Sequence, residues 1–317
     1  MVEKMVENRG ARRKLVGESV LRLGNGQGWQ LASTLQVRSE VRELAKIMGL
    51  KSLEANGYPK LIFIRRGLRK AQFEETIVML SKDTKDIAVG LPMLGWKAHD
   101  LWLLRIWSHN DCPDLICEIT DEESGYEASL LSMRLSLYPI YQRAQDSGGL
   151  PLHAGLVERD GKGILLAGSR NTGKSTCCNR IPYPWHSLCD EEALIVRDDQ
   201  QEYLAHPFPT WSEHLANQCK RTWSVENCVP VSAIFFLEQA VTDEVIHLGQ
   251  GEAAALINQS ATQVFHRFWN NLDREKVRSL KEKLLDNACQ LAKSLQAFKL
   301  RVSVTGRFWD KIEAVSS

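Results

Sequence analysis

The spacing of residues Gly168 to Ser175, which read GSRNTGKS, predicts phosphate binding. It matches the GxxxxGK[ST] loop, in which glycines let the backbone wrap closely around phosphate oxygens and successive N–H groups point at the anion. The lysine of this loop, Lys174, reaches the outer phosphates, and the hydroxyl of Ser175 is placed to bind Mg²⁺. The residues predicted to bind the nucleotide are Gly168, Ser169, Arg170, Asn171, Thr172, Gly173, Lys174, Ser175 and Thr176.

A group of acidic residues follows this loop at a distance suited to phosphate chemistry. Asp190, Glu191 and Glu192 come directly after the run WHSLC. Proteins with this type of loop place there the carboxylates that handle Mg²⁺ or the attacking nucleophile. Three adjacent carboxylates repel one another unless a cation is near, so a cation site is one interpretation. The alternative is a solvated surface turn.

A histidine precedes the loop on what we predict to be a β-hairpin. The stretch LHAGLVERDGKGILLAG has two apolar runs around Asp160-Gly161, the strongest short-range signal for a two-residue hairpin turn. With that turn at the centre, Val157 faces Ile164 and His153 lies opposite Gly168. This register places the imidazole of His153 beside the predicted phosphate site.

The elements around these residues predict an α/β layer architecture for the second half of the chain. The loop follows the apolar run ILLA and precedes a helix starting at Lys174, which should end near Arg180 because Pro182 and Pro184 follow. Residues 186–207 indicate strand, acidic corner, strand, turn and strand. A buried strand over 231–238, helices over 251–271 and 274–295, and a closing strand over 297–304 complete the alternation.

The first half of the chain shows shorter mixed elements, typical of an α+β domain. We expect a helix over 39–50 and strands over 59–67, 75–81 and 100–108. Residues 128–145 look helical in parts, with an interruption at Pro139. The turn-rich stretch DSGGLP then marks a boundary, which predicts a smaller α+β domain over 1–147 and a larger domain over 148–317.

Composition excludes several classes of partner. The net charge of +1 argues against a basic nucleic-acid surface or a polybasic membrane patch. No apolar run approaches the length that spans a bilayer, and no secretory signal is recognised, so we expect a cytoplasmic protein that binds neither nucleic acid nor membrane. The eight cysteines are too sparse for a disulfide scaffold and lack zinc-site spacing, so reduced thiols are expected.

These motifs together resemble a known family. With His153, the GxxxxGKS loop and the acidic corner in order, residues from about 150 to 310 resemble the HPr kinase family and its kinase-like relatives. The stretches AIFFLEQA and FKLRVSVTGRFWDKIE also look like the smaller relatives. LAHPFPTWSEH and the N-terminal half are more similar still to the kinase-like protein of SynChlorMet-type peptide-modification cassettes.

The resemblance implies a P-loop, HPr-kinase-like C-terminal domain that uses ATP and Mg²⁺. By position, His153 would assist near the transferred phosphate beside Lys174, and Asp190 would act as the base toward the acceptor hydroxyl. Glu191 would contribute to metal binding with Ser175. The acceptor implied is a hydroxyl, as of serine, on a peptide or protein, such as a ribosomal precursor peptide. Relatives in the family often assemble, which implies a homo-oligomer.

Departures from the family pattern leave a second function open. The family usually carries Asp-Asp where this chain has Asp190-Glu191, and the Arg-Gly-Leu-Gly stretch of the bifunctional HPr enzymes is absent. Phosphorylase activity and HPr as the substrate are therefore not expected. The alternative to a kinase is a nucleotide-binding partner without transferase activity. A GTPase is disfavoured, because the nearest guanine-type string, NNLD at 270–273, lacks lysine.

Two further segments have competing interpretations. In HPFPTWSEH, the residues His206, Trp211, Ser212 and Glu213 would shape an acceptor cleft, or the loop would simply pack Phe208 and Trp211 into the core. In IRRGLRK, the basic residues Arg65, Arg66, Arg69 and Lys70 would either recognise an acidic peptide segment, giving the N-terminal domain a role in substrate recognition, or form a solvated surface.

Overall fold

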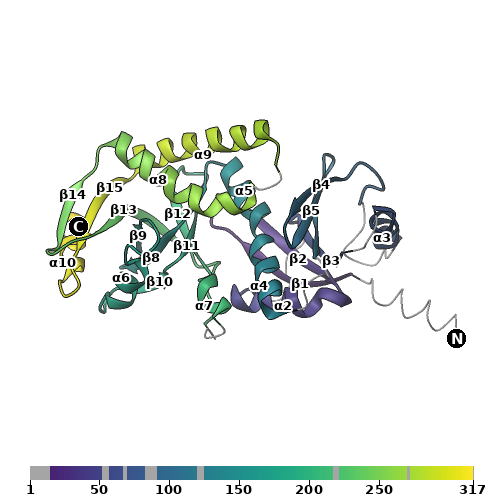
Figure 1. Cartoon of the computed structure of the whole chain (residues 1–317), viewed down its shortest axis with the longest axis horizontal. Helices are drawn as coiled ribbons and strands as arrows, with labels where there is room; N and C mark the ends of the chain where they lie inside the picture. The colour runs from purple at the N-terminus through teal and green to yellow at the C-terminus, as the bar shows by residue number, and fades with distance from the viewer. Residues whose placement is uncertain are drawn as a thin grey trace. The chain divides into compact units, whose positions relative to one another are not determined.

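The computed structural model describes residues 15–51, 57–66, 70–82, 91–119, 125–216, 221–269 and 272–316 (Figure 1). Contacts divide the chain into two compact units. The first comprises Met1–Arg22 and Gln27–Tyr138, and the second comprises Leu23–Gly26 and Pro139–Ser317. The turn-rich stretch 146–151, predicted as the boundary, lies inside the second unit, because the division falls at the start of the helix α5 (Tyr138–Asp146).

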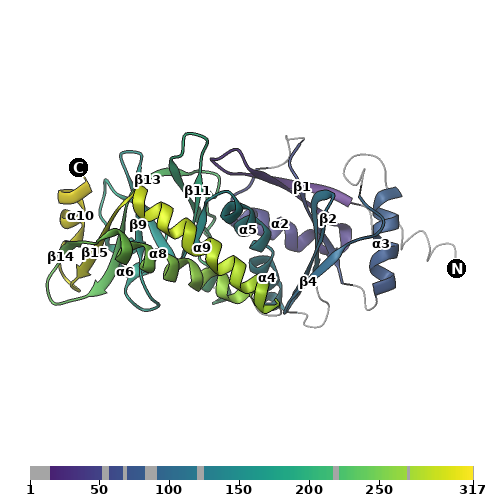
Figure 2. The same cartoon turned by 90° about the horizontal axis from the view of Figure 1, so that it is seen from above.

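The first unit is built on a mixed six-stranded sheet in the order β1-β2-β3-β6-β5-β4. β2, β3 and β6 run parallel at its centre, and the outer pairs are antiparallel. The strands are β1 (Leu15–Arg22), β2 (Gly28–Thr34), β3 (Lys60–Arg65), β4 (Lys97–Leu101), β5 (Leu104–His109) and β6 (Cys112–Ile119). The helices are η1 (Leu35–Val37), α2 (Arg38–Ile47), α3 (Lys70–Lys82) and α4 (Tyr126–Leu135), with α2 and α4 on the opposite side of the sheet from α3 (Figure 2).

Two predicted strands of the first unit are wrong, whereas the helix over 39–50 and the strand over 59–67 are confirmed. Residues 75–81 belong to the helix α3. Its buried residues Phe73, Ile77 and Leu80 recur at helical spacing and pack against the sheet. A short apolar run fits either a strand or a helix, and here packing against the sheet favours the helix. Residues 100–108 form parts of β4 and β5 with a turn between them, where Trp102 is 73% exposed.

The second unit contains a nine-stranded mixed sheet, in the order β10-β8-β9-β13-β12-β11-β7, with β15 also paired to β13 and β14 paired to β15. Its strands are β7 (Leu150–Leu152), β8 (Ala154–Arg159), β9 (Lys162–Ala167), β10 (His186–Cys189), β11 (Glu192–Arg197), β12 (Tyr203–Phe208), β13 (Val229–Gln239), β14 (Glu244–His247) and β15 (Gln296–Val302). The α/β prediction is confirmed at this level: the chain folds as mixed α/β with two mixed sheets. β14 was not predicted.

Helices cover both faces of this sheet (Figure 1). The helices of the second unit are α5, α6 (Lys174–Arg180), α7 (Trp211–Leu215), α8 (Gln250–Phe265), η2 (His266–Phe268), α9 (Arg274–Ser294) and α10 (Phe308–Ser316). α6 and α10 share one core with alternate residues of β9 and β13, such as Ile164, Leu166 and Phe235. α8 and α9 lie over the other face. The predicted helices over 251–271 and 274–295 are confirmed, and α10 was not predicted.

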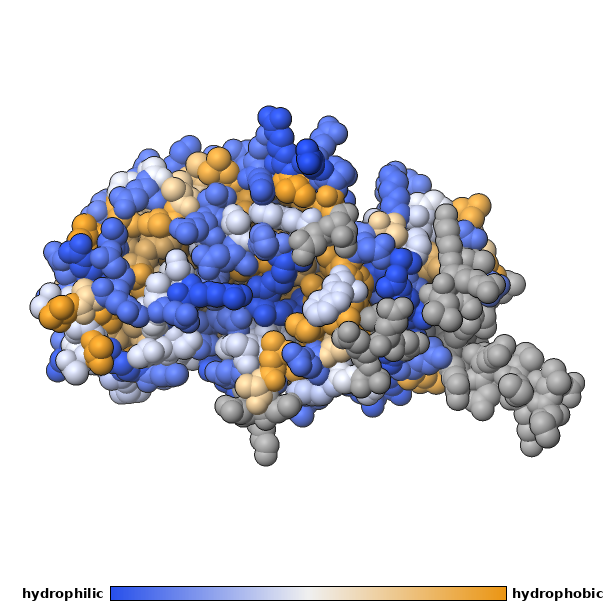
Figure 3. Space-filling model, viewed as in Figure 1, coloured by the Kyte–Doolittle hydropathy of each residue, from blue (hydrophilic) through white to orange (hydrophobic). Residues whose placement is uncertain are grey.

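The outer face of α9 is polar, and hydrophilic residues are visible along it in Figure 3. The buried residues of α9 include Leu280, Leu284 and Leu291, at the three- and four-residue spacing of a helix with one apolar face. The side chain of Asp273 caps its first turn by accepting a hydrogen bond from the Lys276 amide. Within the described residues, no helix is long and apolar enough to cross a bilayer.

The predicted hairpin has the predicted register. Asp160 and Gly161 have φ values of 53° and 76°, which are the two positive φ values that a type I′ turn requires. β8 and β9 then pair from Arg159 opposite Lys162 to Ala154 opposite Ala167. The next residues along the two strands are His153 and Gly168, so the hairpin ends where the loop begins.

Candidate functional site

The GxxxxGKS loop joins the end of β9 to the first turn of α6, as predicted. β9, β13 and β15 run parallel, so their C-terminal ends meet at one edge of the sheet. Ligands of α/β proteins bind outside this edge, because the loops and helix starts there leave backbone groups available. The loop therefore lies where a phosphate site is expected.

Each glycine of the loop motif has its own structural reason. Gly173 has a φ of 98°, a conformation that side chains other than glycine rarely adopt. A Cβ at position 168 would lie 2.7 Å from the hydroxyl oxygen of Thr172, so only glycine leaves room for this turn of the loop. Thr172 donates to the Ser169 carbonyl at 2.9 Å, and Gln239 of β13 donates to the Asn171 carbonyl at 3.0 Å. One bond within the loop and one from β13 thus hold the loop in shape.

Lys174 folds back over the loop. Its ammonium donates to the carbonyls of Gly168, at 3.0 Å, and Ser169, at 2.7 Å, and the residue is only 6% exposed. Burial lowers the pKa of Lys174 to about 8, while the charges of Glu191 and Asp190 oppose that shift. The two predicted acids are therefore near enough to act on the lysine that is predicted to bind phosphate.

His153 is fixed beside the acidic corner as a neutral imidazole. Its Nδ1 lies 3.0 Å from the Glu191 carbonyl, and because a carbonyl only accepts, we assign the proton to Nδ1. Burial, followed by the charge of Lys174, lowers the pKa of His153 to about 4. α8 holds the backbone, because the Ser260 hydroxyl donates to the His153 carbonyl at 3.2 Å. At neutral pH the lone pair of Nε2 is available as an acceptor.

The two acids after β10 are held by hydrogen bonds from neutral groups. Asp190 is 6% exposed and accepts a hydrogen bond from the Thr210 hydroxyl. Glu191 accepts from the amide and the hydroxyl of Ser212, at 3.2 and 3.1 Å. Both donors belong to the HPFPTWSEH segment, which therefore orients the carboxylates without neutralising their charge. Thr210 was missed in the sequence, because only its contact with a residue 20 positions away identifies it.

Glu192 has a different environment from its two neighbours. It is 1% exposed, accepts from the Tyr141 hydroxyl at 3.0 Å and forms an ion pair with Arg267 at 3.0 Å. A buried carboxylate with a cationic partner of this kind belongs to the fold. The three acids that look alike in the sequence are therefore two site candidates and one structural residue.

Two aromatic residues of HPFPTWSEH pack into the core, as the second interpretation of this segment predicted. Phe208 and Trp211 are fully buried. His206 is also fully buried, donates through Nδ1 to the Val225 carbonyl at 2.7 Å and accepts at Nε2 from the Gly24 amide at 3.0 Å. Burial lowers its pKa to about 4. His206 and Trp211 are therefore structural, whereas Ser212 is bonded to Glu191.

The oxygen donors predicted for Mg²⁺ suit that ion only together with phosphates. Ser175 is exposed at the first turn of α6, and Glu191 provides a carboxylate. Among the described residues, no group of three or more His, Cys, Asp or Glu side chains could hold a metal ion. Mg²⁺ in phosphate sites usually takes one or two protein oxygens, substrate phosphates and water. Ser175 and Glu191 could supply these one or two protein oxygens.

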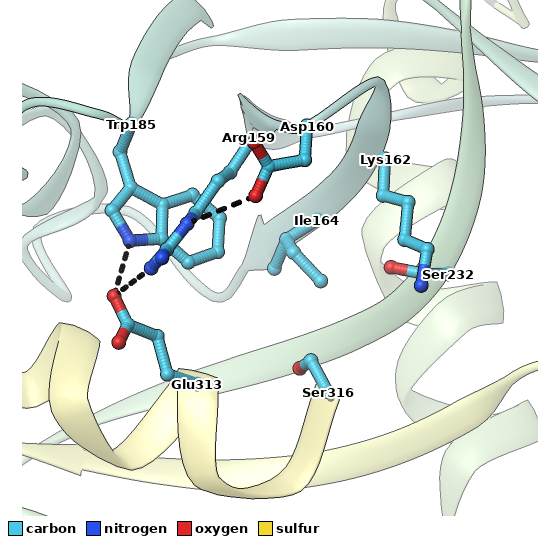
Figure 4. Close-up of a pocket in the computed structure, with 8 residues that line it drawn as sticks. All are labelled: Arg159, Asp160, Lys162, Ile164, Trp185, Ser232, Glu313 and Ser316. Atoms are coloured by element: carbon cyan, nitrogen blue, oxygen red, sulfur yellow. Dashed lines mark hydrogen bonds and ion pairs between the residues drawn. The ribbon is translucent and has the colours of Figure 1, made fainter.

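A cavity of about 210 Å³ lies at the other end of β9, beside the hairpin turn (Figure 4). There Arg159 pairs with Asp160 at 3.3 Å and with Glu313, and its guanidinium lies 5.7 Å from the centre of the Trp185 ring. The indole of Trp185 donates to Glu313 at 3.0 Å, and Lys162 lies across the cavity. The charges of Arg159 are thus matched within the fold.

The basic patch of the first unit is partly neutralised. Arg65 pairs with Glu40 at 2.7 Å, and Arg66 lies 3.7 Å from Asp100. Arg69 and the side chain of Lys70 lie outside the described residues.

The seven described cysteines are free thiols, and Cys219 lies outside the described part of the chain.

A family model described as SynChlorMet cassette protein ScmC matches residues 115–317. This range contains His153, the loop and the acidic corner. No match to the chain was found among curated proteins.

Proposed function

We propose that this chain, which belongs to the family of SynChlorMet cassette protein ScmC, is an ATP-dependent, HPr-kinase-like phosphotransferase. It transfers the γ-phosphoryl group to a hydroxyl, such as that of serine, on a peptide or protein. The cassette association makes a ribosomal precursor peptide the candidate substrate. The observation that carries the proposal is the convergence of Lys174, His153 and the Asp190-Glu191 corner at one end of β9.

In this proposal the loop and Lys174 bind the phosphates, and Asp190 is the base. The acceptor oxygen bonds to the γ-phosphorus while the bond from that phosphorus to the bridging oxygen of the β-phosphate breaks, and ADP leaves with the electron pair. The proton of the hydroxyl passes to Asp190, which the Thr210 hydroxyl orients. Positioning and charge neutralisation supply most of the acceleration in such transfers, so few residues are required.

The other site residues support binding and orientation. His153 is neutral, adds no positive charge beside Lys174 and, through its Nδ1 proton, holds the backbone of Glu191. Ser175 and Glu191 would hold Mg²⁺, which neutralises phosphate charge when it is bound. We extend the proposal to a cytoplasmic homo-oligomer in which the N-terminal unit recognises the substrate.

A second candidate is a nucleotide-binding partner without transferase activity. The observation that favours it is the engagement of Glu191 by Ser212, together with glutamate at a position where kinase relatives carry aspartate. In that case the loop would bind a nucleotide that the protein does not consume.

Intact-mass analysis separates the two candidates. The protein is incubated with ATP, Mg²⁺ and the peptides encoded beside it, and a kinase adds one phosphate to one of them. The matched variant Asp190→Asn should bind ATP and add phosphate far more slowly. If the unaltered protein binds ATP but consumes none of it with any candidate peptide, the non-catalytic partner is favoured.

A further inference from the structure

A second cavity adjoins the phosphate-binding loop. It has a volume of about 240 Å³ and lies between the loop residues Gly168 and Ser169, the helix α8, and the strands β13 and β15. Because the loop forms part of its wall, a molecule that fills the cavity lies next to whatever the loop binds. This cavity is well below the roughly 300–1,000 Å³ of typical drug-sized sites, so it suits a small ring system.

One wall of the cavity is apolar. Phe236 faces α8, because it alternates along β13 with Phe235 and Leu237, which belong to the core on the opposite face. Phe236 is 6% exposed, and Leu256 of α8 is half-buried in the facing wall. These two side chains offer an apolar surface to a flat ligand.

The charged groups of the cavity neutralise one another. The ammonium of Lys299 lies 3.6 Å from Glu238 and 4.0 Å from Glu252, and Glu238 also pairs with Arg301 at 3.4 Å. An additional phosphate or an acidic side chain would therefore meet paired charges there. The cavity favours an uncharged ligand.

Two side-chain amides remain as polar contacts for such a ligand. Gln259 and Gln263 are one helical turn apart on α8, and both line the cavity. Within the part of the chain that the structure describes, no hydrogen bond involves either amide group. A carboxamide presents a donor beside an acceptor, which is the pattern that glutamine uses to form two hydrogen bonds with adenine.

We propose that this cavity binds the adenine nucleoside of a nucleotide whose phosphates the loop holds, with Gln259 and Gln263 recognising the base. The inference rests on the proposed ATP-dependent function and names the base-recognition residues of that site. The neutral, small and partly apolar cavity fits a heterocycle better than it fits an extended peptide.

The test compares two probes that share the phosphates and differ in the nucleoside. Binding of ATP and of inorganic tripolyphosphate, each with Mg²⁺, is measured by calorimetry on the full chain. In the double variant Gln259→Leu/Gln263→Leu, ATP should bind about tenfold more weakly or worse, while tripolyphosphate binds as before. Gln290→Leu, the same change on an exposed position of α9, should alter neither affinity.

Each outcome has one meaning, provided that thermal unfolding shows the variants folded. Unchanged ATP binding in the double variant would overturn the nucleoside site and leave the proposed function standing. Equal loss of both probes would also overturn it, because the amides would then act on the phosphate site. If the unaltered protein binds neither probe, the proposed function fails and this inference fails with it.

Discussion

The two ends of β9 use charged residues in opposite ways. At the hairpin end, Arg159 is matched by Asp160 and Glu313. At the loop end, Lys174 is nearly buried, is bonded only to backbone carbonyls among the described contacts, and has its pKa lowered to about 8. Charges matched within the fold stabilise it, whereas a desolvated cation without an ion-pair partner stabilises a phosphate that reaches it.

The acids show the same contrast. Glu192 is paired with Arg267 inside the unit, whereas Asp190 accepts from the neutral hydroxyl of Thr210 and Glu191 accepts from the neutral groups of Ser212. A neutral donor orients a carboxylate and leaves its charge intact. We therefore expect substitutions at Asp190 to affect chemistry and substitutions at Glu192 to affect folding.

The largest effect is expected at the lysine of the loop. Lys174→Ala should reduce phosphate transfer by about a hundredfold or more, because it removes the charge that stabilises the transferring group. The fold should persist, because the two hydrogen bonds that the variant loses join the side chain to carbonyls of its own loop. Labelled-phosphate transfer from ATP measures the change. Lys162→Ala, at the other end of β9, is the matched control, and equal effects of the two variants would refute the contrast.

The next largest effect is expected at the base. Asp190→Asn should slow transfer by about a hundredfold or more and leave ATP affinity within about threefold, because a base contributes to the chemical step. Turnover and calorimetric affinity are measured on the same preparation. A variant that transfers phosphate at the original rate would remove Asp190 from the mechanism.

Glu192 should affect stability first. Glu192→Gln leaves Arg267 without its ionic partner and should lower the free energy of unfolding by about 2 kcal/mol. This is less than the roughly 3–5 kcal/mol typical of fully buried pairs, because the Arg267 side chain keeps 24% exposure. Urea denaturation measures it. Lost transfer in a variant of unchanged stability would instead place Glu192 in the site.

The lowered pKa of Lys174 predicts a pH dependence of binding. Phosphate favours the protonated amine, so ATP affinity should fall as the pH rises through about 8. The contribution of Lys174 to the stability of the free protein changes in the opposite direction. Between about pH 8 and the ordinary lysine pKa the unfolded chain binds more protons than the folded chain, so this contribution rises with pH. In Lys174→Arg the decline in affinity near pH 8 should be absent, and its persistence would assign it to another group.

The smallest effect is expected at the hairpin end. Arg159→Gln removes ion pairs between partly exposed side chains and should lower the free energy of unfolding by at most about 1 kcal/mol. ATP affinity should stay unchanged. A tenfold weaker affinity would mean that the two ends of β9 are energetically coupled.

Local signals predicted much of this site. The glycine spacing of the loop, the Asp160-Gly161 turn and the prolines after Arg180 each act over a few residues, and all three appear as expected. Such signals failed for α3, because Ile77 and Leu80, which fit the predicted strand over 75–81, pack on the sheet from a helix. A short apolar run does not by itself distinguish the two.

The remaining features depend on contacts between distant segments. Thr210 is bonded to Asp190 across 20 positions, and Glu192 of β11 pairs with Arg267 of η2. No periodicity in the sequence reports either contact. The cavity beside Gln259 and Gln263 likewise exists only because α8 lies over β13 and β15. Which of the three acids is paired with a cation within the fold could therefore be seen only in the folded chain.

Hydrogen exchange of the full chain with and without ATP and Mg²⁺, read by mass spectrometry, tests the central claim most directly. The account predicts slower exchange of backbone amides over residues 168–176 when the nucleotide is bound, with unchanged exchange over 157–164 at the hairpin end. Unchanged exchange over 168–176 at saturating ATP, or protection confined to the hairpin end, would contradict it.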